Sequence, residues 1–235
     1  TLQQSSAASD VYKRQRVDDN AARAMKGVID VVKVGPSSAA GLVGTYSAGD
    51  TIAVVADSYW TAEKALASLK LEWNTEGKER VSSESIFEQF DRDITAGVDR
   101  ANDVAMGDAT AAFDSAATVL TADYRVPYLA HTCMEPPNAT AEVFADRAEI
   151  WVGCQNPLGF RQHLAANLGL DVQQVTLHNY FMGGGFGRKS NADYALQAAM
   201  IARQVGRPVQ MVYSRAEDIK PVSYTHLRAH ETGWY

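Results

Sequence analysis

Two runs rich in Val and Ile stand out in the first third of the chain. Residues 28–34 (VIDVVKV) and 51–56 (TIAVVA) have the β-branched, apolar character that predicts buried strands. Apolar residues then recur at helical spacing over residues 60–69, and residues 71–73 (LEW) continue as a further short strand. This pattern predicts a compact α+β unit that ends near residue 74.

The second half of the chain alternates strand-like and helix-like patterns. The predicted strands cover residues 116–126, 139–144, 149–154, 175–181 and 209–213, and the predicted helices cover 157–168 and 191–205. Asn156 can cap the first helix, Pro157 suits its first position, and Gly169 ends it. The alternation predicts a second, α/β-like domain.

The residues between these parts, 75–114, are polar and only weakly periodic. Ser83 can cap a helix containing Ile86, Phe87 and Phe90, whereas glycine and asparagine interrupt the remainder. We interpret this stretch as a surface connector, since connections of this length usually have a function or lie against a neighbour.

The composition narrows the possible functions. The 235 residues carry a net charge of −6, which gives no basic footprint for nucleic acid. No apolar run reaches the ~18 residues of a membrane-spanning helix, so we expect neither a nucleic-acid partner nor a transmembrane segment. Cys133 and Cys154 show no CxxC spacing, which excludes an iron–sulfur cluster or zinc site built from this chain alone. We expect both thiols to be buried.

Both ends of the chain have an unusual sequence. Residues 5–15 (SSAASDVYKRQ) and 222–232 (VSYTHLRAHET) resemble peptides translated from sequencing-adapter DNA at the edges of metagenomic fragments. We therefore expect residues 1–15 and 222–235 to be non-native. The natural sequence would then run from about residue 16 to residue 221, as a fragment of a longer protein.

The most informative local pattern is the run 181–190 (FMGGGFGRKS), in which glycine occupies four of the five positions 183–187. Glycine leaves the backbone unobstructed and permits positive φ, so peptide N–H groups can approach a phosphate, a pterin or an oxo group. A predicted strand precedes this glycine loop and a predicted helix follows it. The arrangement is typical of a cofactor-binding loop.

Three interpretations compete for the loop on its residues alone. A nucleotide P-loop, GxxxxGK[ST], fails at one position because Arg188 stands where the second glycine belongs. A dinucleotide fingerprint, GxGxxG, lacks its third glycine at the same place and its later acidic residue. A bend without a ligand would be a costly use of four glycines, given the entropy that each loses on folding.

Three motifs together resemble a known family. The string 183–189 (GGGFGRK), preceded by residues 155–157 (QNP) and 134–136 (MEP), is similar to the molybdenum-binding subunit of the xanthine dehydrogenase/aldehyde oxidase family. Within this family the match is best to the branch of isoquinoline 1-oxidoreductase beta subunits and bacterial aldehyde or nicotinate dehydrogenases. The resemblance implies an α+β fold with a hammerhead-like domain over 16–75, a connector over 76–115 and part of a molybdopterin-binding domain over 116–221.

The resemblance also implies a cofactor and its contacts. The cofactor is molybdenum on molybdopterin, expected in its cytosine dinucleotide form. The backbone N–H groups of Gly185, Phe186 and Gly187 would face the metal's oxo ligand and the dithiolene, and the Gln155 amide would donate to the oxo ligand. No side chain is expected to ligate the metal directly. The full set of expected cofactor-binding residues is Gln155, Gly184, Gly185, Phe186, Gly187 and Arg188.

Each of these residues also has a simpler interpretation. Gln155 can be a helix-entry residue that pairs with backbone, and Phe186 can be a plug that packs the loop onto the core. Arg188 and Lys189 can neutralise a pyrophosphate or can be solvated at a helix start. The sequence leaves these alternatives open.

The resemblance implies an oxidoreductase that hydroxylates N-heteroaromatic rings or oxidises aldehydes, with water as the oxygen source. Electrons would leave through a small [2Fe-2S] partner subunit. Ser190 stands where the xanthine-oxidising branch carries Glu, so xanthine is not an expected substrate. Glu135 is expected to be structural or to line a substrate channel, because the family's catalytic base lies elsewhere. We therefore expect no catalytic residue in this fragment, and an inactive fragment. The alternative is a P-loop-like nucleotide-binding module, and the compartment stays open.

Overall fold

The computed structural model divides the chain into two compact units. One contains residues 1–78 and 130–235, and the other contains residues 79–129. The described residues are 2–7, 13–35, 37–41, 44–48, 51–74, 82–97, 106–126 and 129–219. No helix in this described part of the chain is both long enough and apolar enough to cross a membrane.

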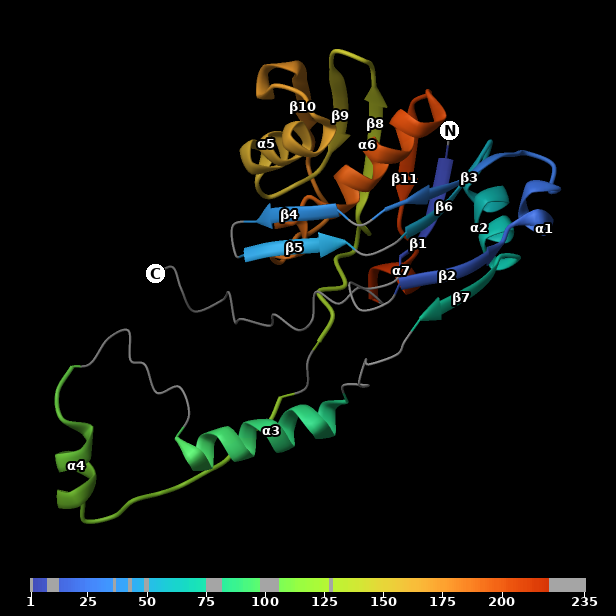
Figure 1. Cartoon of the computed structure of the whole chain (residues 1–235). Coiled ribbons are helices and arrows are strands. Elements are labelled where there is room, and N and C mark those ends of the chain that lie inside the picture. The colour runs from blue at the N-terminus through green and yellow to red at the C-terminus, as the bar shows by residue number, and fades with distance from the viewer. Residues whose placement is uncertain are drawn as a thin grey trace. The chain divides into compact units, whose positions relative to one another are not determined.

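A seven-stranded mixed sheet forms the larger unit (Figure 1). Its strand order is β10-β9-β8-β11-β1-β6-β3. The strands are β1 (Leu2–Ala7), β3 (Val28–Val34), β6 (Thr51–Ala56), β8 (Asn138–Val143), β9 (Ala148–Val152), β10 (Val175–Asn179) and β11 (Val209–Val212). β9 pairs with β10 in parallel and β1 with β11 in parallel, while the other neighbours are antiparallel.

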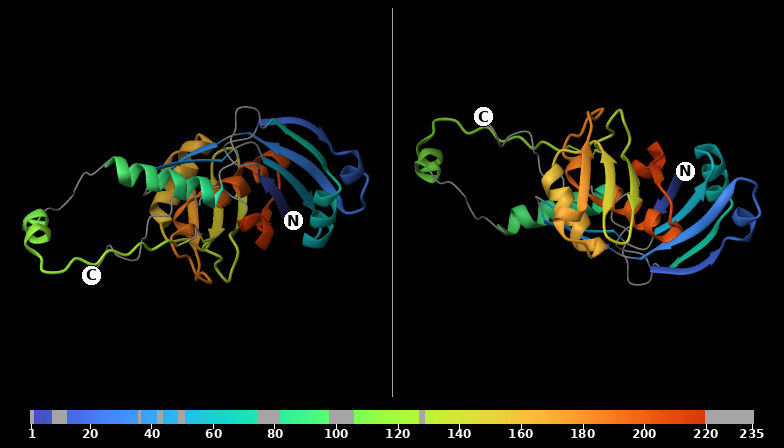
Figure 2. Two further views of the ribbon diagram at one scale, coloured as in Figure 1. Left: turned by 90° about the horizontal axis from the view of Figure 1, so that it is seen from below. Right: turned by 90° about the horizontal axis from the view of Figure 1, so that it is seen from above.

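Helices cover this sheet at both ends. They are α1 (Asn20–Arg23), α2 (Tyr59–Ala67), α5 (Pro157–Leu168), α6 (Asp193–Val205) and α7 (Arg215–Ile219). Figure 2 shows α2 against the blue and teal strands, and α5 and α6 against the yellow and orange strands. Every residue of β6 is buried. Ile52 and Val54 pack with α1 and α2, and Ala53 and Val55 join the core built around α6.

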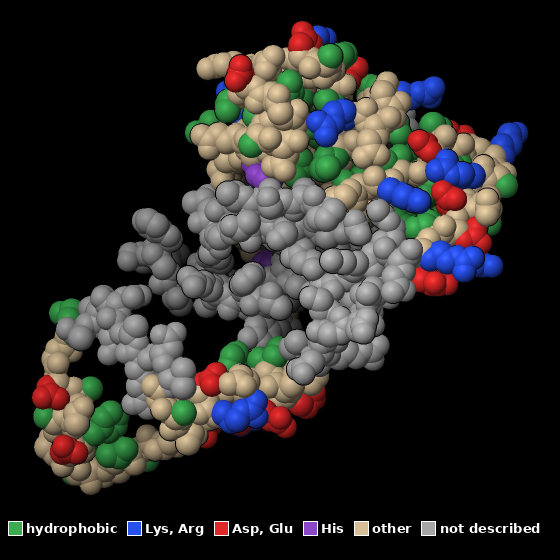
Figure 3. Space-filling view, in the orientation of Figure 1, with side chains coloured by type: hydrophobic (Ala, Val, Ile, Leu, Met, Phe, Trp, Pro, Cys, Tyr) green, Lys and Arg blue, Asp and Glu red, His purple; other side chains and the backbone are tan. Residues whose placement is uncertain are grey.

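Smaller elements complete the unit. β2 (Lys13–Asp18) pairs with β7 (Lys70–Asn74), and β4 (Ser37–Gly41) pairs with β5 (Gly44–Ala48). Two 3-10 turns, η1 (Val172–Gln174) and η2 (Arg188–Ser190), flank β10 and the glycine loop. Acidic and basic side chains are interspersed over the visible surface of this unit (Figure 3).

Most predicted elements are present, with one clear exception. The strand predicted over residues 116–126 is wrong, because within the described residues this segment pairs with no other strand. The predicted strand 175–181 ends at Asn179, and the predicted helix 191–205 begins at Asp193 after the η2 turn. The helix 157–168 begins and ends where the sequence predicts, with the Asn156 side chain accepting from the Gly159 N–H.

The smaller unit contains two helices. α3 (Ser83–Ala96) is capped by Ser82, one residue before the predicted cap, and α4 (Ala109–Ser115) is capped by Asp108. None of its residues within 82–97 and 106–126 is buried. An exposed ion pair of 2.8 Å joins Arg125 to Asp91. The described residues of this unit therefore form no apolar core.

The non-native ends stay a prediction. Residues 8–12 and 220–235 lie outside the described residues, while β1 joins β11 to β6 in the sheet. Without β1, the sheet would separate into β10-β9-β8-β11, from the predicted molybdopterin-binding domain, and β6-β3, from the predicted hammerhead-like domain. Ala53 and Val55 of β6 nevertheless pack in the core built around α6, independently of β1. The division at 16–75 and 116–221 stays a prediction.

Candidate cofactor-binding site

Three chain segments meet at one edge of the sheet. In the parallel pair, Val152 of β9 lies opposite Asn179 of β10, so both strands end at this edge. β8 runs antiparallel to β9, with Ala139 opposite Val152, and therefore begins there. Gln155 follows β9, the glycine loop follows β10, and Glu135 precedes β8. Ligands commonly bind beyond the carboxyl ends of strands in such sheets.

The glycine loop has a strained backbone. Gly184 and Gly187 have φ of 92° and 87°, and Phe186 has φ of 48°. A positive φ costs a bulky residue about 1–3 kcal/mol and is typically found at functional sites. The Phe186 side chain is 68% exposed, so the plug interpretation is wrong. Burial of the ring therefore does not offset the cost of the positive φ, which points to a function of the backbone at this position.

Two glycines are required by close neighbours on either side of the loop. A Cβ atom at Gly183 would lie 2.6 Å from Cβ of Glu135, and one at Gly185 would lie 2.5 Å from Oε1 of Gln155. Both distances are shorter than any normal contact. The glycines therefore allow the loop to fit between Glu135 and Gln155. A bend that only reverses the chain would not require such a close fit.

Gln155 is hydrogen-bonded to the loop through both its backbone and its side chain. Its N–H donates to the Lys189 carbonyl at 3.0 Å, and its Oε1 accepts from the Gly187 N–H at 3.0 Å. Because Oε1 is engaged, the amide Nε2 is left as the donor, and it has no partner within the described part of the chain. The Gly187 N–H is committed to Gln155, so the expectation that it faces a ligand does not hold in this structure.

The loop carries backbone donors that the protein leaves unused. Among the residues described, the N–H groups of Gly184, Gly185 and Phe186 donate no hydrogen bond. The carbonyl of Gly185 is engaged, because it accepts from Cys133 Sγ at 3.3 Å and from the Arg188 N–H at 2.8 Å. Backbone N–H groups are nearly always paired when buried. Of these three residues only Gly185 is buried, while Gly184 is partly buried and Phe186 is exposed. The loop therefore offers backbone donors that a bound electron-rich group could accept from.

Arg188 lies inside the protein. Its side chain is 1% exposed, and Nη1 and Nη2 each donate at 2.8 Å to the carboxylate of Asp193, the first residue of α6. The solvated interpretation of Arg188 is therefore wrong. Its charge is already balanced by Asp193, so Arg188 contributes to the site by anchoring the loop to α6. Asp193 was not among the predicted site residues, although the sequence places an acidic residue in the first turn of this helix.

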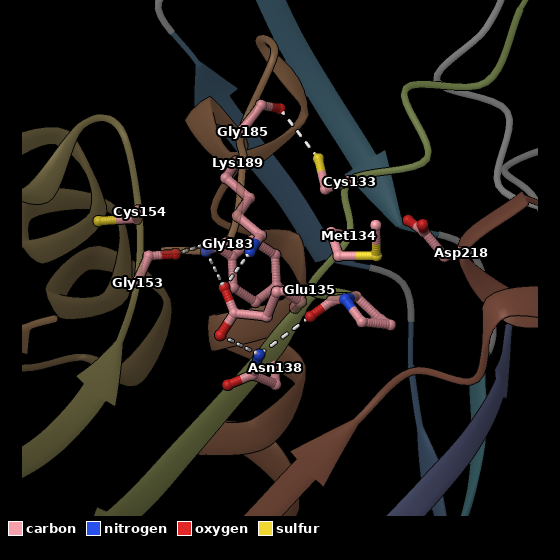
Figure 4. A network of polar contacts seen from close by, with 12 residues as sticks. Cys133, Met134, Glu135, Asn138, Gly153, Cys154, Gly183, Gly185, Lys189 and Asp218 are labelled. Carbon is pink, nitrogen blue, oxygen red and sulfur yellow. Dashed lines mark hydrogen bonds and ion pairs between the residues drawn. The ribbon is translucent and has the colours of Figure 1, made fainter. Parts of the chain in front are cut away.

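Lys189 is also internal, with 1% of its side chain exposed. Its Nζ donates to Glu135 Oε2 at 2.5 Å (Figure 4). The solvated interpretation of Lys189 is therefore wrong too. A P-loop lysine must reach a phosphate, and this one is committed to a carboxylate, so the nucleotide-binding alternative has no support in the geometry.

Glu135 accepts three hydrogen bonds. Besides Lys189, the Gly183 N–H donates to Oε2 at 2.7 Å and Asn138 Nδ2 donates to Oε1 at 3.0 Å. Burial by itself would raise the pKa of Glu135, but the donated hydrogen bonds outweigh it, Lys189 first, so the pKa lies below its ordinary value. A carboxylate held in this way is a poor proton acceptor, which supports a structural role.

Both cysteines are buried, as expected. Cys133 lies under the loop, and Cys154 contacts the Asn179 side chain through both its N–H and its Sγ. Burial raises the pKa of the Cys154 thiol to about 11. Within the described residues, no group of three or more His, Cys, Asp or Glu side chains is arranged to hold a metal ion.

The sequence of this chain matches one protein family over most of these elements. Residues 91–231 match the family described as "Molybdopterin cofactor-binding domain". The chain belongs to this family. The loop, Gln155 and Glu135 all lie within the matched residues.

Curated relatives of the molybdopterin family agree with this assignment. The chain is 31% identical over 213 residues to "Membrane-bound aldehyde dehydrogenase [pyrroloquinoline-quinone]" of Gluconacetobacter polyoxogenes, covering 88% of the chain and 26% of that protein. It is 28% identical over 215 residues to "Isoquinoline 1-oxidoreductase subunit beta" of Brevundimonas diminuta, with the same coverage of 88% and 26%. The chain thus spans about a quarter of these relatives.

Solved structures share the fold. Quinoline 2-oxidoreductase from Pseudomonas putida 86 superposes with a TM-score of 0.65 at 21% identity, covering 92% of this chain and 31% of that chain. Aldehyde oxidoreductase from Desulfovibrio gigas gives a TM-score of 0.61 at 22% identity, covering 92% and 27%. This chain therefore shares the mixed fold of strands and helices with parts of these two oxidoreductases, and the α+β fold class that the resemblance implies is confirmed.

Proposed function

We propose that this chain is part of the molybdenum-binding subunit of a molybdenum hydroxylase, and that the edge formed by the glycine loop and Gln155 holds molybdopterin. The observation that carries the proposal is a loop whose Phe186 stands at positive φ, with its N–H unused among the described residues, and whose next residue, Gly187, is hydrogen-bonded to the Gln155 side chain. The Phe186 N–H and the Gln155 amide are both neutral donors. They suit an oxo ligand on a metal whose charge changes with its redox state, because they bind it without adding charge.

The expected binding residues divide into two groups in this proposal. Phe186, Gly184 and Gly185 supply backbone N–H groups, and Gln155 supplies its side-chain amide. Gly187 and Arg188 act indirectly, since Gly187 orients Gln155 and Arg188 anchors the loop. When bound, the molybdenum cofactor would supply the two-electron redox chemistry. We propose the cytosine dinucleotide form of molybdopterin, following the resemblance to the bacterial branch.

We propose for the parent protein the hydroxylation of an N-heteroaromatic ring or the oxidation of an aldehyde, with water as the oxygen source. The names of the relatives support these substrate classes, since they include an aldehyde dehydrogenase and an isoquinoline oxidoreductase. A small [2Fe-2S] subunit is the proposed electron-accepting partner. We propose that this fragment alone does not turn over. The carboxylate beside the loop, Glu135, is already committed to three donors.

Metal and pterin analysis tests the proposal. The chain is purified from a bacterial host that makes molybdopterin and from one that cannot, and molybdenum and pterin are measured per chain. We expect both only from the competent host. Gln155→Ala should lower the content about tenfold, because a hydrogen bond to an ionised group contributes about 1.5–3 kcal/mol. Gln162→Ala, an exposed glutamine on α5, is the matched control and should change nothing.

The same measurement separates the competing outcomes. No molybdenum or pterin in protein from the competent host, either in this chain or in the complete subunit, would refute the proposal. Retention of pyrroloquinoline quinone, which one relative's name carries, would assign the site to another cofactor. Equal loss of molybdenum in the Gln155 and Gln162 variants would show that Gln155 makes no specific contact.

A further inference from the structure

The two ends of the glycine loop converge on a single carboxylate. The Gly183 N–H, at the start of the loop, and Lys189 Nζ, just beyond its end, both donate to Oε2 of Glu135, at 2.7 and 2.5 Å. In Figure 4 dashed lines join one oxygen of this carboxylate to both donors, and Asn138 lies below the other oxygen. The side chain of Glu135, which is not part of the loop, therefore holds the two ends of the loop together.

Backbone contacts reinforce this closure. The Glu135 N–H donates to the Gly183 carbonyl at 3.0 Å, so the two residues are joined by hydrogen bonds in both directions. Gly183 also approaches Glu135 so closely that any side chain would clash. Nearby, Cys133 Sγ donates to the Gly185 carbonyl. Two residues of the segment before β8, Cys133 and Glu135, thus make three hydrogen bonds with the loop.

Burial makes this arrangement sensitive to the charge of Glu135. Lys189 is 1% exposed, and among the described residues the acceptor of its ammonium group is Glu135. An ammonium group buried without a counter-ion is strongly disfavoured. If Glu135 were neutral, Lys189 would have to move toward water, and the backbone of the loop would move with it.

From these contacts we propose that Glu135 is the positioning residue of the glycine loop. It holds Gly183 and Lys189 in place, and so fixes the donor at Phe186 and the Gln155–Gly187 hydrogen bond on the opposite side of the loop. The link to cofactor binding rests on the function proposed above. The positioning itself is a property of the cofactor-free chain and is tested there.

The test is backbone amide hydrogen exchange on the 235-residue chain, comparing wild type with Glu135→Gln. We expect exchange at Gly183 and Gly187 to accelerate at least about tenfold. The Leu196 amide, which donates to the Ala192 carbonyl within α6, should keep its rate. Gly187 is the decisive position, because it contacts Gln155 and not Glu135. The matched control is Glu142→Gln in β8, which should leave all three rates unchanged.

Two further variants distinguish a local role from general stability. Lys189→Met should also accelerate exchange at Gly187. Combining it with Glu135→Gln should bring the rate partly back toward wild type, because neither a buried ammonium group nor a carboxylate without its counter-ion then remains. If Glu135→Gln fails to fold, Lys189→Met is judged by the same criterion. An unchanged rate at Gly187, or equal acceleration at Leu196, would overturn the proposal.

Molybdenum content is measured on the same variants. Faster exchange at Gly187 with normal molybdenum retention would confirm the positioning and deny its importance for the cofactor. If exchange at Gly187 is faster in Glu135→Gln but the wild-type chain itself never binds molybdenum, the positioning role stands and the proposed function is refuted. The two inferences can therefore fail separately.

Discussion

The buried ion pair between Arg188 and Asp193 allows a quantitative prediction. The two side chains are 1% and 3% exposed and are joined by two hydrogen bonds of 2.8 Å. Removing one partner of such a pair costs about 3–5 kcal/mol, because the other charge stays buried and uncompensated. We therefore expect Asp193→Asn to destabilise the cofactor-free chain by about 4 kcal/mol. With an m-value of about 2 kcal/mol/M, the urea midpoint would fall by about 2 M.

The assay is urea unfolding followed by circular dichroism, with a double variant and a surface control. Arg188→Met combined with Asp193→Leu should be within about 1–2 kcal/mol of wild type, since an apolar pair can replace a buried ion pair. Asp146→Asn should cost less than about 0.5 kcal/mol, because its pair with Arg147 spans 3.4 Å and is 52% and 75% exposed.

The result also decides what Arg188 does. If its main partner were a bound pyrophosphate, Asp193→Asn would leave the cofactor-free protein almost unchanged. A cost below about 1 kcal/mol would refute the buried-pair reasoning. A double variant as unstable as the sum of the single variants would refute it equally, because additivity means that the two sites do not interact.

Three further predictions concern pH, thiol reactivity and the N-terminal strand. The pKa of Glu135 is lowered from its ordinary 4.5, so its contribution to stability is complete above that value and is lost as pH falls through the folded pKa. The free energy of unfolding, measured with urea, should accordingly fall more between pH 6 and pH 3 in wild type than in Glu135→Gln. Equal falls in the two proteins would contradict this. With its pKa near 11, Cys154 should be alkylated at pH 8 at least about 100-fold more slowly in the folded than in the urea-unfolded chain; equal rates by mass spectrometry would contradict its burial. Deleting residues 1–12 should shift the urea midpoint by less than about 0.5 M, because β1 (LQQSSA) lacks the apolar residues of a central strand, and loss of cooperative unfolding would show that β1 is native.

Local rules predicted the elements whose signals lie within a few residues. β6 was recognisable because its run of apolar residues is buried on both faces. α5 was bounded by Asn156 and Gly169, which cap it as their chemistry suggests, Gly169 at φ of 66°. The strand predicted over residues 116–126 was wrong because its formation depends on a distant part of the chain. Its residue types fit a strand, but a strand forms only where a second strand pairs with it, and the local sequence does not identify that partner.

The candidate site was predicted only in part. The pattern alone showed a loop rich in N–H donors, while the pairing of that loop with Gln155 came from the family resemblance. The structure supplies the physical reason, since parallel β9 and β10 bring both segments to one edge of the sheet. Ion-pair partners could not be found from the sequence, because Glu135 lies 54 positions from Lys189. Long-range pairing of this kind depends on topology.

The pairing of these charges determines how the site can bind a ligand. In sequence, Arg188 and Lys189 look like cations offered to an anion, but Asp193 and Glu135 neutralise them within the protein. What faces outward is therefore a set of neutral dipoles, the unused loop N–H groups and the Gln155 amide. Neutral donors discriminate by position and direction, which fixed backbone geometry provides. The two ion pairs hold the far end of the loop, at Arg188 and Lys189, and so keep this backbone geometry in place.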